Sequence, residues 1–118
     1  MDDNKPITAL KERAAKEPNN PEAFYTISTY YWDEVYFDFR LKDAQKRALI
    51  QKGIDAIDRA LQIKPDYMEA FVYKNLLVRL KANLEKDPAK RQALITQADH
   101  LRDQAQDLQK QRVAGASD

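Results

Sequence analysis

Apolar residues recur at three- and four-residue steps along most of the chain, and prolines divide this pattern into segments. Such spacing places apolar side chains on one face of an α-helix, whereas alternation in steps of two would indicate a half-buried strand. The breaks lie at Pro18, Pro21, Pro65 and Pro88, and proline cannot continue a helix beyond its first turn. The pattern therefore predicts an all-α chain of five helices.

Capping residues indicate where these helices begin. A short first helix over residues 7–16 ends before Pro18. The second begins at Asn20, with Pro21 at the first helical position, and runs to Tyr36. Three aspartates are predicted to cap the remaining helices, and these are Asp43, Asp66 and Asp87.

The sequence contains an internal duplication. Residues 18–24 and 65–71 share the frame Pro-x-x-x-Glu-Ala-Phe at an offset of 47, and residues 49–60 match residues 94–105 at an offset of 45. Each unit contains two predicted helices. Repeated helix pairs of this length bury their apolar faces by stacking on one another.

The first unit resembles the tetratricopeptide repeat, which has characteristic residues at fixed positions of both helices. The matching residues are Phe24, Ile27, Ser28 and Tyr31 in the first helix, Gly53, Ile57 and Ala60 in the second, and the following Pro65. The resemblance covers residues 7–112 and is nearest to bacterial repeat proteins with one enlarged repeat. It implies a right-handed solenoid of antiparallel helix pairs that binds other proteins and has no enzymatic activity.

The spacing between Tyr31 and Gly53 exceeds that of an ordinary repeat, so either the helices or the loop between them is longer. We expect a single tetratricopeptide-like domain over residues 1–118. Its parts are a partial helix at 7–16, an enlarged first helix pair at 20–64, a second pair at 66–112, and a frayed tail at 113–118.

The second unit carries polar residues at positions where the family prefers apolar or small ones. Lys74 and Asn75 replace Leu and Gly, and Arg102 replaces an apolar ring. A polar residue at a packing position disfavours stacking of another repeat, so the fifth helix is predicted to be a polar C-terminal cap.

Aromatic residues are concentrated in residues 24–39, which hold eight of the eleven in the chain. At 100° per residue, Phe24, Ile27, Tyr31 and Val35 form an inward stripe, which leaves other rings beside it. In the family, the first helix of each pair lines a concave groove. By that resemblance, the predicted partner-binding residues are Tyr25, Thr29, Trp32, Tyr36, Tyr73, Leu76 and Arg79. The alternative is that these rings cover the long helices as part of the core.

Composition and charge narrow the possible functions. The chain has 20 Lys and Arg against 19 Asp and Glu, mixed along its length, so it lacks the basic field that attracts nucleic acid. Without cysteine it has no thiol chemistry and no thiolate metal site. The N-terminus lacks a signal-peptide pattern, and no apolar run suffices for membrane insertion. The compartment stays open between cytoplasm and periplasm.

Candidate chemistry is sparse. His100 lies beside Asp99 and Asp103, and side chains of these types can bind a metal ion. Without a second His or a Cys, they indicate a solvated polar face instead, so no metal or cofactor is expected. Nothing in the sequence supplies a nucleophile or phosphate loop beside the carboxylates of residues 34, 38 and 43. We expect a non-catalytic module that binds a peptide or protein partner. The alternative is a structural domain that forms homo-oligomers as a fragment of a longer repeat array.

Overall fold

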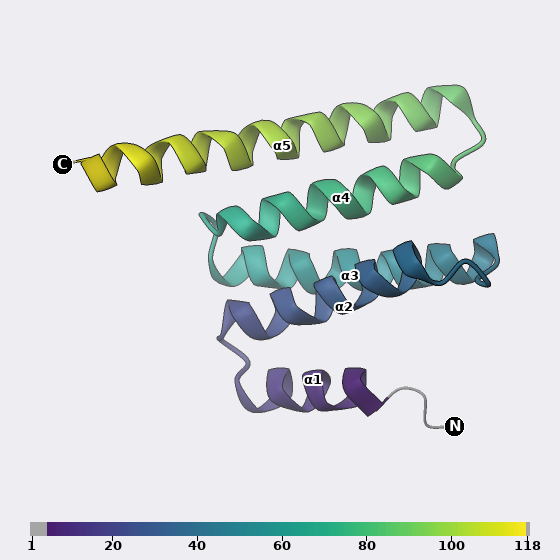
Figure 1. The fold of residues 1–118 in the computed structure, drawn as a ribbon, viewed down its shortest axis with the longest axis horizontal. Helices are drawn as coiled ribbons and strands as arrows, with labels where there is room; N and C mark the ends of the chain where they lie inside the picture. The colour runs from purple at the N-terminus through teal and green to yellow at the C-terminus, as the bar shows by residue number, and fades with distance from the viewer. Residues whose placement is uncertain (1–4, 118) are drawn as a thin grey trace.

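The computed structural model describes residues 5–117, which form five α-helices joined by short connections (Figure 1). The helices are α1 (Lys5–Lys16), α2 (Pro21–Phe37), α3 (Asp43–Ile63), α4 (Met68–Leu84) and α5 (Pro88–Ser117). Within these residues there is no strand. The prediction of an all-α chain with five helices is confirmed.

Each helix packs against its neighbours in sequence order, from α1 to α5, and α2 also contacts α4. In Figure 1, α1 and α5 lie at opposite ends of the row of helices. The described residues measure 51 × 40 × 21 Å along their principal axes. The two terminal helices therefore each have one helical neighbour, whereas α2, α3 and α4 have more than one.

The internal duplication of the sequence is also present in the structure. Helix α4 begins and ends 47 residues after α2, and α5 begins 45 residues after α3. Buried residues recur at the same offsets. These pairs are Ala23 and Ala70, Tyr31 and Val78, Gly53 and Ala98, and Ala60 and Ala105.

Local capping explains where two of the helices begin. The Asn20 Oδ1 atom accepts a hydrogen bond from the Glu22 backbone N–H at 3.0 Å. Asp87 Oδ1 accepts one from the Ala89 backbone N–H at the same distance. Each satisfies a backbone donor that has no partner within its own helix. The predicted caps Asn20 and Asp87 are confirmed.

The predicted caps Asp43 and Asp66 are wrong. Asp43 is the first residue of α3, after Lys42, whose backbone N–H donates to Gln45 Oε1 at 2.8 Å. Asp66 precedes Tyr67, which is the N-cap of α4 without a side-chain capping bond. The ring of Tyr67 packs against α2, so tertiary contacts rather than a side-chain cap fix this helix start.

The extra residues of the first unit lengthen its helices. Only residues 38–42 separate α2 from α3, so the longer-loop alternative does not hold. At the other end of the chain, α5 continues through residues 113–117, where a frayed tail was predicted. Ala114 and Ala116 have high helix propensity, whereas Gly115 between them disfavours the helix. Residue 118 lies outside the described part.

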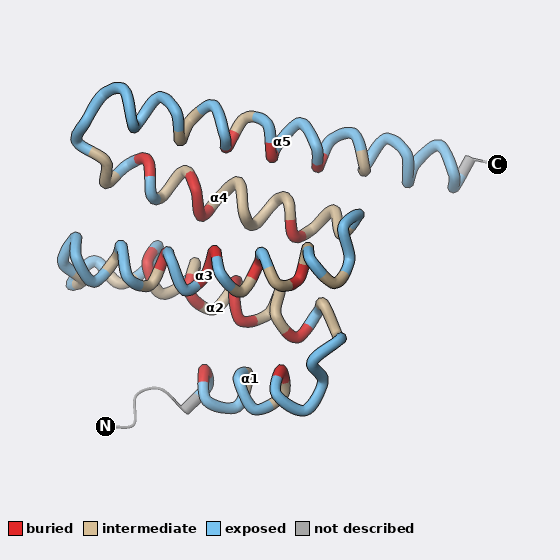
Figure 2. The backbone as a smooth tube through the Cα atoms, turned by 180° about the vertical axis from the view of Figure 1, so that it is seen from behind, coloured by how far each residue is buried: buried red, intermediate tan, exposed pale blue. Residues whose placement is uncertain are grey.

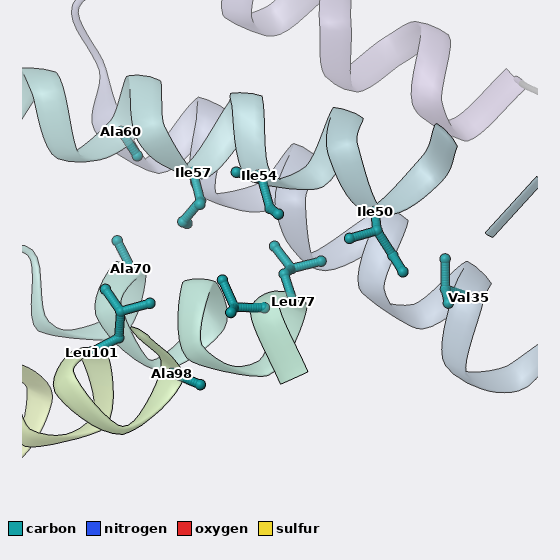
Figure 3. Close-up of a cluster of buried hydrophobic side chains, with 10 residues drawn as sticks. Val35, Ile50, Ile54, Ile57, Ala60, Ala70, Leu77, Ala98 and Leu101 are labelled. Atoms are coloured by element: carbon teal, nitrogen blue, oxygen red, sulfur yellow. The ribbon is translucent and has the colours of Figure 1, made fainter. Parts of the chain in front are cut away.

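The core lies between the helices, and α3 occupies its centre. Ile54 and Ile57 of α3 point toward Leu77 and Ala70 of α4, as Figure 3 shows. On α5, the buried residues all lie on the side that faces α4 (Figure 2). They are Ala98, Leu101 and Ala105.

Gly53 permits the close approach of three helices. A Cβ atom at this position would lie 3.0 Å from Leu77 Cδ2 on α4 and 3.4 Å from Tyr31 Cβ on α2. The first distance is shorter than ordinary van der Waals contact. A small residue at the centre of α3 thus allows α2 and α4 to pack on it at the same level.

Candidate protein-binding surface

A row of aromatic rings runs along the contact between α2 and α4. We call Tyr67, Tyr25, Tyr73, Trp32 and Tyr36 the aromatic row. Tyr25 has ring centroids 5.4 Å from both Tyr67 and Tyr73. The Tyr73 ring lies edge-on to Trp32 at 6.2 Å, and Trp32 stacks on Tyr36 at 4.6 Å. Four of the seven predicted binding residues are therefore brought together.

Four of the five rings in the aromatic row are half-buried, and Tyr36 is the exposed one. Burial raises the pKa of Tyr25 above its ordinary value and that of Tyr67 to about 12, because a buried phenolate is poorly solvated. Trp32 and Tyr73 are half-buried, and Tyr36 is 60% exposed. The row therefore lies against the core as far as Trp32, and only Tyr36 at its end faces solvent.

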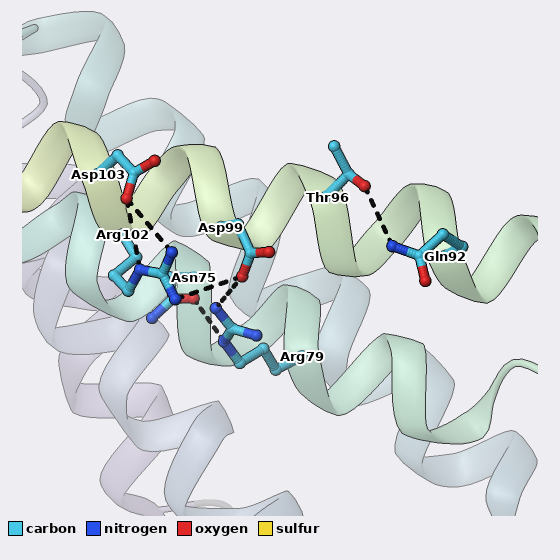
Figure 4. Close-up of polar contacts among 7 residues, drawn as sticks. All are labelled: Asn75, Arg79, Gln92, Thr96, Asp99, Arg102 and Asp103. Carbon is cyan, nitrogen blue, oxygen red and sulfur yellow. Dashed lines mark hydrogen bonds and ion pairs between the residues drawn. The ribbon is translucent and has the colours of Figure 1, made fainter.

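The other three predicted binding residues lie outside the aromatic row. The Thr29 hydroxyl donates to the Thr26 carbonyl at 2.8 Å, and Leu76 is half-buried on α4. Arg79 donates to Asn75 Oδ1 on its own helix and to Asp99 Oδ1 on α5, both at 2.8 Å (Figure 4). Arg79 is thus directed toward α5.

Arg79 belongs to a polar cluster on α4 and α5. Arg102 lies 3.5 Å from Asp99 Oδ1 and 3.4 Å from Asp103 Oδ1. The hydrogen bond from Arg79 holds the pKa of Asp99 below its usual range. At the 45-residue offset, Asp99 and Arg102 occupy the places of two buried isoleucines of α3, Ile54 and Ile57. The corresponding face of α5 is therefore polar.

The outer face of α5 is largely accessible to solvent. Gln97, Arg102 and Gln106 are exposed, and Asp99 is partly so. His100 is exposed as well, and arginines engage the carboxylates of residues 99 and 103 on either side of it. Among the residues that the structure describes, no group of three or more His, Asp or Glu side chains is placed to hold a metal ion.

The aromatic row continues where α2 ends, since the Phe37 ring lies edge-on to Trp32 at 6.4 Å and to Tyr36 at 5.0 Å; sequence reasoning did not assign this end to a site. Phe37 and Phe39 are 70% and 90% exposed. They line an open groove of about 430 Å³, which we call the α2-end groove; its lining residues are Asp33, Glu34, Phe37, Asp38, Phe39 and Arg40. Their signal in the sequence is the succession of aromatic and acidic residues just before the next helix.

Sequence reasoning also missed Tyr67. This residue precedes α4, outside the helical periodicity on which the aromatic stripe was based, yet its ring closes the packed end of the row. Its place two residues after Pro65, within the duplicated frame, is the signal that marks it. A periodicity argument confined to helices cannot include a residue that lies between them.

None of the helices in residues 5–117 combines the length and the apolar character needed to cross a bilayer. Comparison with protein-family models, with curated proteins and with solved structures yields no match to this chain.

Proposed function

We propose that the chain is a non-catalytic protein-interaction module, which binds a peptide or protein partner along the aromatic row. The observation that carries this proposal is the open end of the row, where Trp32 stacks on the exposed Tyr36. Exposed aromatic groups of this kind are typical of binding surfaces, because rigid rings bury a large area at low entropic cost. Tyr and Trp are also enriched among the residues that dominate binding energy.

The proposed architecture is a right-handed solenoid of antiparallel helix pairs of the tetratricopeptide kind. Two observations support it: the helix bounds repeat at fixed offsets, and helices contact mainly their neighbours in sequence. Such arrays expose a continuous surface along which an extended partner can lie. In this proposal α2 and α4 supply that surface, and the polar α5 ends the array.

Within the surface, the residues differ in their expected contribution. Tyr36 is the main anchor, because it is exposed, and the half-buried Trp32 stacks on it. Tyr25 and Tyr73 support them from the packed side. Thr29 and Leu76 extend the surface along the helices, and Arg79 lies at its margin, because its guanidinium is already bound to α5.

The test is selection of ligands from a library of random peptides displayed on phage, with the chain immobilised. We expect selected peptides whose affinity falls by about 2 kcal/mol, or about thirtyfold in Kd, when Tyr36 is replaced by Ala. Val113→Ala, which truncates an exposed residue of α5, is the control and leaves Kd unchanged. Failure to select any peptide that depends on Trp32 or Tyr36 contradicts the proposal.

The second candidate function is self-assembly, with the exposed rings of one copy packing on another. The same exposed residues, Tyr36, Phe37 and Phe39, favour it. Light scattering coupled to size-exclusion chromatography separates the two functions. A monomer over a wide range of protein concentration excludes self-assembly, whereas a dimer that Tyr36→Ala dissociates supports it.

A further inference from the structure

The C-terminal end of α2 has aromatic and acidic side chains but no basic residue in its last turn. The last carbonyl groups of a helix carry a partial negative charge, which cations stabilise. Here the carboxylates of Asp33 and Glu34 add to that negative charge. The two exposed rings, Phe37 and Phe39, complete the lining of the α2-end groove.

The equivalent end of α4 is covered differently. There, the Arg91 side chain donates to the Glu85 carbonyl at 2.9 and 2.7 Å, and the Arg47 side chain donates to the Leu84 carbonyl at 3.2 Å. The last turn also contains Lys81, which stands 47 residues after Glu34. The chain thus supplies its own cations where α4 ends and carboxylates where α2 ends.

Within the α2-end groove, the negative charges exceed the positive ones. Arg40 is paired with Asp38 at 3.0 Å, which uses the single cation of the lining. Glu34 accepts a long hydrogen bond from the Tyr30 hydroxyl at 3.5 Å. Asp33 forms no ion pair within the described part of the chain. Two carboxylates therefore remain available beside two exposed rings.

We propose that the α2-end groove binds a basic segment of the partner, in which an arginine or lysine stands next to an apolar residue. The cation pairs with Asp33 and Glu34 and lies over the face of Phe37 or Phe39, and the apolar side chain packs on the other ring. Charge-assisted hydrogen bonds and cation–π contacts favour this arrangement. This inference rests on the proposed function, since it specifies the partner.

The direct test uses two synthetic peptides with blocked ends, Arg-Leu-Arg-Leu-Arg and Glu-Leu-Glu-Leu-Glu, titrated into the isotopically labelled chain. We expect the basic peptide to shift the backbone amide signals of residues 33–40, and the acidic peptide to leave them unchanged. Binding should weaken at high salt, which screens exposed charges. Shifts spread over α1 and α5 instead would overturn the proposal.

Charge variants separate a specific site from general attraction. The double variant Asp33→Asn/Glu34→Gln is expected to weaken binding of the basic peptide about tenfold. The control, Glu12→Gln/Asp107→Asn, removes the same charge from exposed positions of α1 and α5 and is expected to have little effect. Equal losses in the two variants refute the proposal.

The aromatic contribution is tested by Phe37→Ala/Phe39→Ala, with thermal unfolding followed by circular dichroism to show that the fold is kept. We expect the basic peptide to lose most of its affinity, because the exposed rings contribute to binding rather than to the core. Unchanged affinity in the folded variant contradicts the role of the rings.

The phage selection described above distinguishes this inference from the proposed function. Selected peptides that combine a basic and an apolar residue, and that lose affinity in the charge variant, support both. Selected peptides that depend on Trp32 and Tyr36 but carry no basic residue overturn the inference and leave the proposed function standing. Self-association that is lost on replacing Phe37 and Phe39, without binding of the basic peptide, overturns the inference as well.

Discussion

The Nζ atom of Lys74 on α4 lies 2.7 Å from the Oδ1 atom of Asp58 on α3. Lys74 occupies a position that is apolar in the first unit, where its counterpart at the 47-residue offset is the buried Ile27. The ion pair thus replaces an apolar contact between neighbouring helices. It lies at the edge of the core, where the lysine stem is mostly covered and the carboxylate is half accessible.

Removing this ion pair is expected to have a small effect on stability. A double-mutant cycle of Lys74→Met and Asp58→Asn should give a coupling energy below about 1 kcal/mol, because the carboxylate is well solvated. The measurement is urea unfolding of the four proteins, repeated at high salt, where the coupling should decrease. A coupling well above this value would show that the pair is more buried than its exposure indicates.

Ala60→Trp is expected to destabilise the fold strongly. Ala60 is fully buried and points toward Ala70 on the neighbouring helix (Figure 3). Overpacking of such a contact costs about 1–3 kcal/mol or more, a large part of the stability of a small domain. The control is Ala48→Trp, at an exposed position of the same helix. Similar thermal midpoints for the two variants would contradict the packing of α3 on α4.

The stability of the fold is expected to decrease above pH 10 because of Tyr67. Its pKa is raised from about 10 to about 12, chiefly by burial. The unfolded chain therefore loses this proton at a lower pH than the folded chain does. The stabilisation is fully present below pH 10 and is lost as pH rises toward 12.

Tyr67→Phe should accordingly reduce the slope of stability against pH in this range. The exposed Tyr36 provides the matched control, since Tyr36→Phe should retain the slope. Urea unfolding at several pH values measures both variants. Some slope should remain in Tyr67→Phe, because burial also raises the pKa of Tyr25. Identical slopes in all three proteins would contradict the packing of Tyr67 on α2.

Making the polar face of α5 apolar is expected to cause self-association. In α3 the corresponding residues are isoleucines that pack against α4. Asp99→Ile/Arg102→Ile would recreate that apolar face on α5, where no further helix covers it. Burial of each isoleucine against a second copy of the chain would then stabilise the complex by about 1.5–3 kcal/mol. Light scattering should show dimers or larger species. The control Gln104→Ile/Asp107→Ile, at other exposed positions of α5, should remain monomeric.

Local signals in the sequence were sufficient to predict much of the fold. Asn20, Pro21 and Asp87 mark helix starts through their own backbone chemistry, and the duplicated frame carries over from one unit to the next. The start of α4 could not be predicted in this way, because the packing of Tyr67 against Tyr25 depends on the placement of a distant helix.

The candidate site was less predictable than the fold, because α2 carries aromatic residues on more than one side. Periodicity separates the buried Tyr31 from Trp32, but it does not show which rings α4 covers. Arg79 was assigned to the same surface as the rings, yet it pairs with Asp99. The direction of the Arg79 side chain depends on where α5 packs. The residue pattern within α4 gives no information about the position of α5.

The order of helix contacts has a consequence for how the chain opens and folds. Contacts between helices are formed by consecutive pairs, with α2 and α4 as the exception among the described helices. Such short-range topology lowers the entropic cost of closing loops and favours rapid folding. Because α5 contacts α4 alone, it can detach while the other four helices keep their contacts with one another. Amide hydrogen exchange should therefore be faster toward the C-terminal end of α5, and in α1, which contacts α2 alone, than in α2 and α4, which each contact three other helices.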